Sequence, residues 1–75
     1  MNQGFDAVTA QLVLALARDG SIGRTAAREN IAPSAVSRRI SELEARLGIA
    51  LFERLPQGMV PTAAGRIYAC LLYTS

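Results

Sequence analysis

Apolar residues recur at helical spacing in several stretches of the chain, and turn residues separate these stretches. In the first, Phe5 to Asp19, the apolar positions lie three or four residues apart, at Phe5, Val8, Leu12, Ala15 and Leu16. Gly20 follows at the place where a residue in left-handed conformation commonly ends a helix. The pattern therefore predicts a first helix over residues 5–19.

This first segment is also apolar on a second side, at Ala7, Ala10, Leu14 and Ala17. A second packing partner beyond the core would explain that composition. The high helix propensity of alanine on an exposed face would explain it equally well. The residues leave both explanations open.

Two further helices are expected before residue 48. Ser21 suits the N-cap of a short helix over about Gly23–Asn30. Pro33 suits the first turn of the next helix, because its φ angle is already helical and an N–H there needs no partner. That helix, predicted over residues 34–47 and ended by Gly48, carries an apolar stripe at Val36, Ile40, Leu43 and Leu47.

The other face of helix 34–47 is polar and consists of short side chains and an arginine. Hydroxyl and guanidinium groups reach base edges and phosphates when a helix lies in the major groove of DNA. The stripe can anchor the helix while this face remains available, so the segment is predicted to be a recognition helix with Ser34, Ser37, Arg38 and Ser41 outward.

After Gly48 the pattern changes to short extended segments and then returns to helix. Residues 49–54 and Met59-Val60 flank a turn that contains Pro56 and Gly58, which predicts a β-hairpin, or wing, over residues 51–60. Thr62 suits the N-cap of a last helix. The chain left is too short to bury the apolar face of that helix, which consists of Ala64, Ile67, Tyr68, Leu71 and Leu72.

The elements together predict a mostly α fold with a small β-hairpin: a winged helix-turn-helix of three core helices, a two-stranded wing and the start of a linker helix. We expect the winged domain over residues 1–61 and the beginning of the linker helix over residues 62–75. In this architecture the first helix of the pair braces the second, which lies in the major groove. Many winged-helix domains bind protein instead, so an interaction or dimerisation module with negligible DNA binding of its own is the alternative.

Composition agrees with one small domain of 75 residues. With 51% apolar and 19% charged residues, the chain is too hydrophobic to be disordered. Its longest apolar run, Leu12 to Ala17, is far below the roughly 20 residues that span a bilayer, so neither a membrane span nor a signal peptide is expected. Because Cys70 is the single cysteine, no internal disulfide can form, which fits a cytoplasmic setting.

Charge and side-chain chemistry narrow the function classes. All eight basic residues are arginines and the net charge is +2, which permits a nucleic-acid partner without requiring one. The chain has no histidine, no glycine-rich phosphate loop after a strand and no second cysteine beside Cys70. We therefore expect no enzyme, no metal site and no cofactor.

A longer series of residues falls into one register between Gly20 and Gly65. It comprises Gly20-Ser21, Ala26, Ala35-Val36-Ser37-Arg38, Ile40, Leu43-Glu44, Leu47-Gly48, Leu51-Phe52-Glu53-Arg54, Thr62 and Ala64-Gly65. In identity and spacing the series resembles the N-terminal DNA-binding domain of the LysR-type transcriptional regulators. The resemblance covers nearly the whole chain, and so many matches are far more specific than a helix-turn-helix pattern alone.

The resemblance implies a bacterial regulator that binds operator half-sites in double-stranded DNA. Ser34, Ser37 and Arg38 match positions that contact bases and phosphates, and Arg54 matches the wing arginine on the backbone. Pro33 stands where the family often has a base-reading glutamine, so a direct donor is missing. At the sides of the same helix, Arg39 is a candidate for a phosphate contact and Ser41 lies near the edge.

The family also implies a homodimer through the linker helix and a small-molecule effector that binds a domain absent from this chain. Ile67, Tyr68, Leu71 and Leu72 are then the expected dimerisation residues, and the second apolar side of the first helix is expected to pack against this helix.

Overall fold

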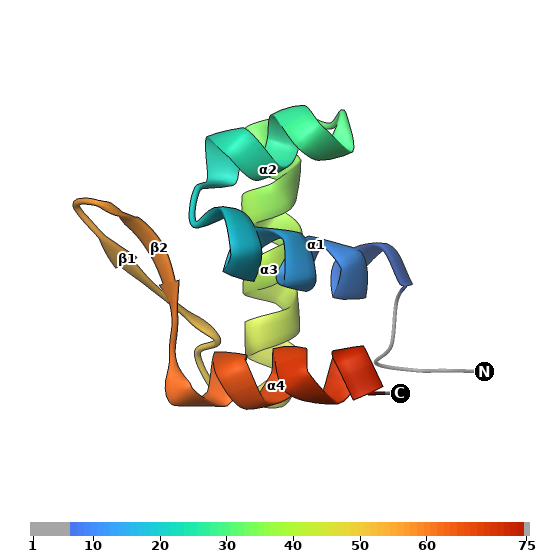
Figure 1. The fold of residues 1–75 in the computed structure, drawn as a ribbon, viewed down its shortest axis with the longest axis vertical. Coiled ribbons are helices and arrows are strands. Elements are labelled where there is room, and N and C mark those ends of the chain that lie inside the picture. The colour runs from blue at the N-terminus through green and yellow to red at the C-terminus, as the bar shows by residue number, and fades with distance from the viewer. Residues whose placement is uncertain (1–6, 75) are drawn as a thin grey trace.

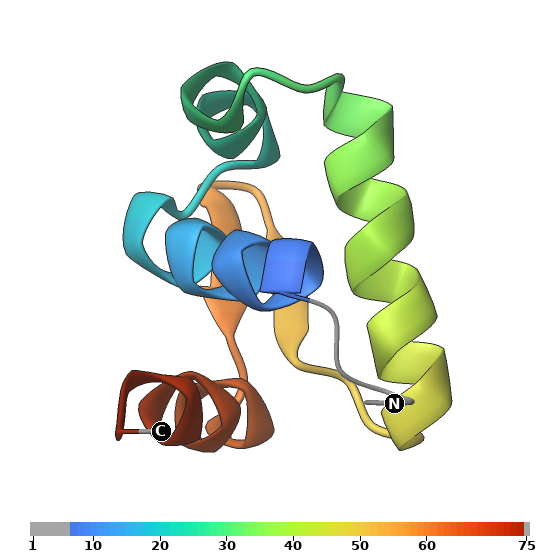
Figure 2. The same cartoon turned by 90° about the vertical axis from the view of Figure 1, so that its right-hand side faces the viewer.

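The structure is a computed structural model that describes residues 7–74. In chain order it contains the helices and strands α1 (Ala7–Asp19), α2 (Ile22–Glu29), α3 (Pro33–Leu47), β1 (Phe52–Leu55), β2 (Gly58–Pro61) and α4 (Ala63–Thr74). Helix α3 runs along the longest direction, with α2 beside its first turns and α4 level with its last ones (Figures 1 and 2). The predicted helical fold with a small hairpin is confirmed.

Local sequence sets most of the helix ends, as predicted. The Ser21 hydroxyl accepts a hydrogen bond from the Arg24 N–H at 3.2 Å and caps α2. Pro33 occupies the first turn of α3, and Gly48 ends that helix with a φ of 74°. Because a left-handed φ strains residues with a Cβ atom, glycine fits this position better than other residues.

Helix α2 ends one residue earlier than predicted, because Asn30 is its C-cap. Asn30 has a φ of 62°, and its N–H bonds back to the carbonyl of Ala27 at 3.3 Å. The next N–H, that of Ile31, donates to the Ala26 carbonyl at 3.0 Å. Asparagine tolerates this conformation better than most residues, so it ends the helix here as glycine ends α3.

The core gathers between α1, α2, α3 and the start of the wing. On α1 the inward row runs at helical spacing through Thr9, Leu12, Val13 and Leu16. Leu51 and Phe52 bring the beginning of the wing into the same cluster. The buried hydrophobic residues of this cluster are Leu12, Val13, Leu16, Ala26, Val36, Ile40, Leu43, Leu51 and Phe52.

Two residues expected in the core are exposed. Val8 lies one position off the inward row of α1, where Thr9 takes the buried place, and is 51% exposed. Leu47, the last apolar position of the α3 stripe, is 44% exposed because the final turn of α3 extends past α1 (Figure 2). Phe5, also expected on the core side, lies outside the described residues.

Helix α4 provides the second packing partner of α1. The two helices are in contact, and Ala10 of α1 and Tyr68 of α4 line the same small cavity. Tyr68 and Leu72 also pack against the core cluster, as does Ala17 of α1. On the second apolar side of α1, Ala10 thus faces a cavity shared with α4, Ala17 packs against the core cluster itself, and Ala7 is exposed.

The apolar face of α4 divides into two rows. Ala64, Tyr68 and Leu72 are partly buried against the core. Ile67 and Leu71, four residues apart, are 62% and 60% exposed. The expectation that the chain leaves this face uncovered is therefore confirmed for one row only.

The wing is a two-stranded antiparallel hairpin in which Phe52 pairs with Pro61 and Leu55 with Gly58. The predicted wing over residues 51–60 contains both strands except for Pro61, the last residue of β2. Ile49, predicted to be extended, lies before β1 in a bend. None of the helices within residues 7–74 is long and apolar enough to cross a bilayer.

Candidate nucleic-acid interface

One side of α3 presents a continuous row of mostly polar residues to solvent. The positions follow one another at i, i+1, i+4, i+5 and i+8, which places them on one broad stripe of the helix. All are exposed except Ser37, which is partly buried, and together they are Pro33, Ser34, Ser37, Arg38 and Ser41. The core-facing stripe of Val36, Ile40 and Leu43 holds the helix in place while this row stays open.

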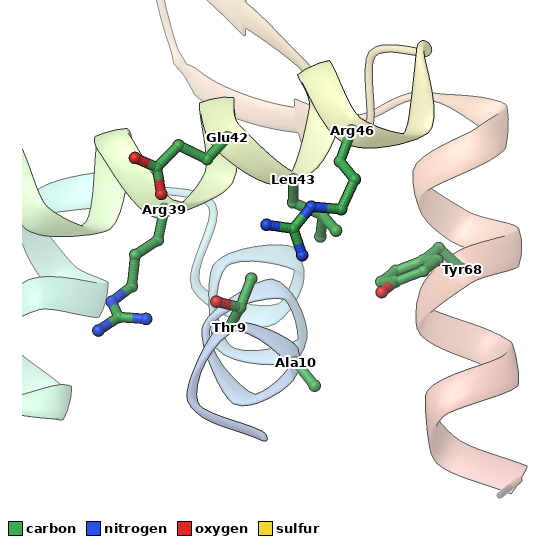
Figure 3. Close-up of a pocket in the computed structure, with 7 residues that line it drawn as sticks. All are labelled: Thr9, Ala10, Arg39, Glu42, Leu43, Arg46 and Tyr68. Carbon is green, nitrogen blue, oxygen red and sulfur yellow. The ribbon is translucent and has the colours of Figure 1, made fainter. Parts of the chain in front are cut away.

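Arg39 does not belong to this row. It is partly buried on another side of α3, where it lines a cavity of about 70 Å³ together with Thr9, Glu42 and Tyr68 (Figure 3). Arg46 lines the same cavity from the last turn of α3. The structure thus separates Arg39 from the other candidate residues of the recognition helix.

The wing places its arginine beside the beginning of α2. Arg54 on β1 is exposed, and it lines a shallow cavity of about 140 Å³ with Ser21 and Ile22 at the α2 N-terminus. The first N–H groups of a helix carry a partial positive charge and favour anions. Arg54 and the two residues at the start of α2 therefore line the same hollow.

A backbone hydrogen bond fixes the second strand of the wing to the α1–α2 turn. The Met59 N–H donates to the Gly20 carbonyl at 2.9 Å. At Gly58 a Cβ atom would overlap that carbonyl, so the hairpin can approach so closely only with glycine there. This contact fixes the position of β2 relative to the start of α2.

Glu44 fixes the first strand, and the sequence analysis missed this role. One carboxylate oxygen, Oε2, accepts hydrogen bonds from the Leu51 N–H at 2.7 Å and the Phe52 N–H at 3.1 Å. In the sequence, Glu44 stands out only as part of the Leu43-Glu44 motif. The signal available was an acidic residue in the last turn of a helix, shortly before a segment whose N–H groups need acceptors.

A second feature that the sequence did not reveal is the ion pair between Asp19 and Arg28. The Asp19 carboxylate, whose side chain is 6% exposed, lies 3.4 Å from Nε of Arg28 and 3.7 Å from Nε of Arg18. Arg28 therefore braces α2 against the end of α1. Arg24, on the same helix, is exposed.

A separate apolar groove of about 270 Å³ lies between the end of α3 and α4. Ile67 and Leu71 line it from α4, and Leu47 and Ile49 line it from α3 and the following bend. All four side chains are exposed hydrophobics. Of the expected dimerisation residues, Ile67 and Leu71 thus lie at the open surface, whereas Tyr68 and Leu72 also pack inward.

The pattern that defines bacterial regulatory helix-turn-helix proteins of the lysR family matches residues 9–66. The chain belongs to this LysR family. Among curated LysR-type relatives it is 42% identical over 55 residues to the transcriptional regulator ClcR of Pseudomonas putida, which covers 73% of this chain and 19% of that protein. It is 45% identical over 51 residues to the transcriptional activator AmpR of Pseudomonas aeruginosa, covering 68% of this chain and 17% of that protein.

Solved structures of LysR proteins give the same result for the fold. The DNA complex of the CbnR DNA-binding domain matches with a TM-score of 0.88 at 27% identity, over 93% of this chain and 80% of that one. The complex of the BenM DNA-binding domain with benA site 1 DNA also gives 0.88, at 26% identity, over 93% and 81%. The winged helix-turn-helix prediction is thereby confirmed.

These matches establish the class of function. The LysR relatives are transcriptional regulators, so the chain is a DNA-binding domain of a regulator and not an enzyme. The chain spans less than a quarter of the length of both relatives.

Proposed function

We propose that this LysR-family domain reads operator DNA as a dimer, with α3 in the major groove and the wing on the adjacent phosphate backbone. The observation that carries the proposal is the exposed row Pro33 to Ser41 on α3, with the exposed Arg54 on a wing that is tied to the same core. A helix-turn-helix domain docks in this way.

Only a few side chains are proposed to contact the bases. Ser34, Ser37 and Arg38 are the proposed readers of base edges, and Arg38 has the reach and the two donors to bind guanine. Pro33 carries no donor, so it contributes shape and apolar contact only. Ser41 lies farther along the row and is proposed to approach the backbone at the edge of the groove.

Backbone contact falls to the wing and the start of α2. Arg54 lines one hollow with Ser21 and Ile22, so a phosphate placed there would lie beside both the wing arginine and the start of α2. Such contacts position the protein without reading sequence. Arg39 stays outside this proposal because it lines the cavity beside Thr9 and Glu42 instead.

Dimerisation is proposed to involve the outer row of α4. Ile67 and Leu71, with the groove beside them, offer an apolar surface that a second copy can cover, while Tyr68 and Leu72 hold α4 on its own core. Two copies would bind two half-sites. The longer regulator would act in the cytoplasm, with any small-molecule effector bound to a domain absent from this chain.

Selection from a random DNA pool tests this function. We expect the chain to retard duplex DNA at low salt and to select a partly symmetric sequence with two half-sites about one helical turn, or a multiple of it, apart. Dimerisation in solution without any retardation of DNA at low salt would favour the alternative, a protein-interaction module.

A further inference from the structure

We propose that Glu44 is a positioning residue for DNA binding: its carboxylate holds the wing at a fixed place relative to the recognition helix, and this fixes the position of Arg54. The inference rests on the proposed function, in which Arg54 contacts phosphate. Glu44 itself touches no DNA in this arrangement; it acts through the backbone of Leu51 and Phe52.

The contacts of Glu44 join the end of α3 to the start of β1. Its side chain accepts from the N–H groups of Leu51 and Phe52, at 2.7 and 3.1 Å. Its backbone carbonyl accepts from Gly48 and Ile49, at 2.8 and 3.2 Å. Glu44 therefore accepts from four backbone N–H groups in the segment that joins α3 to β1.

Leu51 extends this connection to α4. Its carbonyl accepts from the Thr62 N–H at 2.9 Å, and its side chain is 1% exposed in the core. Arg54 follows Phe52 by two residues on the same strand. A shift of the Leu51–Phe52 backbone would therefore move the guanidinium of Arg54 relative to the exposed row of α3.

Loss of the Glu44 contact should displace the wing without unfolding the domain. The second strand keeps its hydrogen bond from Met59 to Gly20, and Thr62 still donates to the carbonyls of Ala50 and Leu51. The hairpin ladder between Phe52 and Pro61 also remains. A variant can therefore lose the fixed position of the wing relative to α3 and still stay folded.

A variant that keeps the charge separates positioning from simple electrostatics. A carboxylate near DNA repels phosphate through its charge, so a variant with the same charge should bind DNA unchanged if charge alone mattered. A positioning role predicts instead that disturbing Glu44 weakens binding even when the net charge is unchanged. Glu44→Asp is the suitable variant, because it keeps the charge but shortens the side chain by roughly 1.5 Å.

The experiment measures affinity for a duplex selected by the wild-type chain and for a duplex of random sequence, between about 50 and 200 mM salt. The variants are Glu44→Asp, Arg54→Ala, their double variant, and Glu44→Gln, whose amide oxygen can still accept both N–H groups. Glu42→Asp is the matched control, since Glu42 is an exposed acidic residue on the same helix. Circular dichroism confirms folding, and amide exchange of Leu51 and Phe52 reports the contact itself.

If Glu44 positions the wing, Glu44→Asp lowers the slope of log affinity against log salt by about 0.9, the value for one phosphate contact. Arg54→Ala gives the same loss, the double variant loses no more than either, and Glu44→Gln and Glu42→Asp keep the wild-type slope. An unchanged slope for Glu44→Asp, despite faster amide exchange at Leu51 and Phe52, would overturn the inference. Failure of the proposed function gives a different result: the single variant Arg54→Ala then leaves the salt slope unchanged, because Arg54 contacts no phosphate.

Discussion

Arg38 and Arg54 are both exposed arginines on different elements, and the proposed function gives them different tasks. Arg38 belongs to the exposed row of α3, and Arg54 to the first strand of the wing. Base readers set sequence preference, whereas backbone contacts strengthen binding to all sequences alike. The two substitutions should therefore change different properties.

Replacing Arg38 with alanine should weaken binding to the selected duplex by about 1–3 kcal/mol and relax specificity at one base position. Arg54→Ala is the comparison, and should weaken selected and random duplexes equally while lowering the salt slope by about one. Competition binding at fixed salt measures both. Equal losses on the two duplexes for Arg38→Ala would show that Arg38 reads no base.

Two threonines should respond to the same substitution with opposite signs. Thr25 is fully buried, and among the described residues its hydroxyl has no hydrogen-bond partner. An unpaired buried polar group costs about 1–3 kcal/mol, so Thr25→Val should stabilise the domain and raise the melting temperature by several degrees. Calorimetry measures the shift, and a lower melting temperature would show that the hydroxyl is satisfied in solution.

Thr62→Val is the matched comparison. The Thr62 hydroxyl donates to the Ala50 carbonyl at 2.7 Å and accepts from the Gly65 N–H at 3.1 Å. Its loss removes the cap of α4 and should destabilise the domain by about 0.5–2 kcal/mol.

At the scale of elements, the approach of α4 to the wing depends on Gly65. A Cβ atom there would overlap the carbonyl oxygen of Leu51, and a backbone atom cannot move aside easily. Gly65→Ala should therefore destabilise the domain by about 1–3 kcal/mol. Gly23→Ala, in the first turn of α2 where only the Ser21 hydroxyl lies near, should be neutral or stabilising by about 0.5–1 kcal/mol. Urea unfolding measures the free energy of unfolding of both variants. Equal changes in the two variants would contradict this prediction.

The sequence predicts the elements well because their signals are local. Ser21, Gly48 and Thr62 each mark a helix end within a few residues of the groups that they cap, and the structure confirms all three. Asn30 shows the limit, since asparagine is a less frequent left-handed C-cap than glycine and marks the helix end less clearly. Helix bounds are therefore right to within about one residue wherever the ends are described.

What the sequence could not predict depends on contacts between distant residues. The exposure of Leu47 follows from how far α3 extends past α1, and that of Val8 from which side of α1 turns toward the core; periodicity encodes neither. The role of Glu44 depends on where Leu51 and Phe52 return to α3. For the candidate site, the row on α3 is predictable from spacing, but the separation of Arg39 is known only once α1 and α4 are in place.

At the scale of the whole molecule, two unlike surfaces lie on different parts of the domain. The polar row of α3 and the wing form one, and the apolar groove between α3 and α4 forms the other. The proposed DNA contact and the proposed dimer contact therefore use different residues. Each can be tested by substitutions that leave the other surface unchanged.

Ile67→Glu should weaken self-association at least about tenfold, because it places a charge in an apolar contact, and should leave the melting temperature nearly unchanged since Ile67 is 62% exposed. Tyr68→Ala should instead lower the free energy of unfolding by about 1–2 kcal/mol, because Tyr68 packs against the core. Sedimentation velocity and thermal unfolding measure the two effects. A wild-type chain that stays monomeric at high concentration would contradict the dimer proposal.

The central claim is that α3 and the wing form the DNA-binding surface, and amide chemical shifts during a DNA titration test it most directly. On addition of the selected duplex, we expect the largest changes at residues 34–41, in β1 and β2, and at the start of α2. The amides of Ile67 and Leu71 should change little at constant dimer concentration. Changes concentrated on α4 and the groove, with those of Ser34 to Ser41 unmoved, would contradict the account.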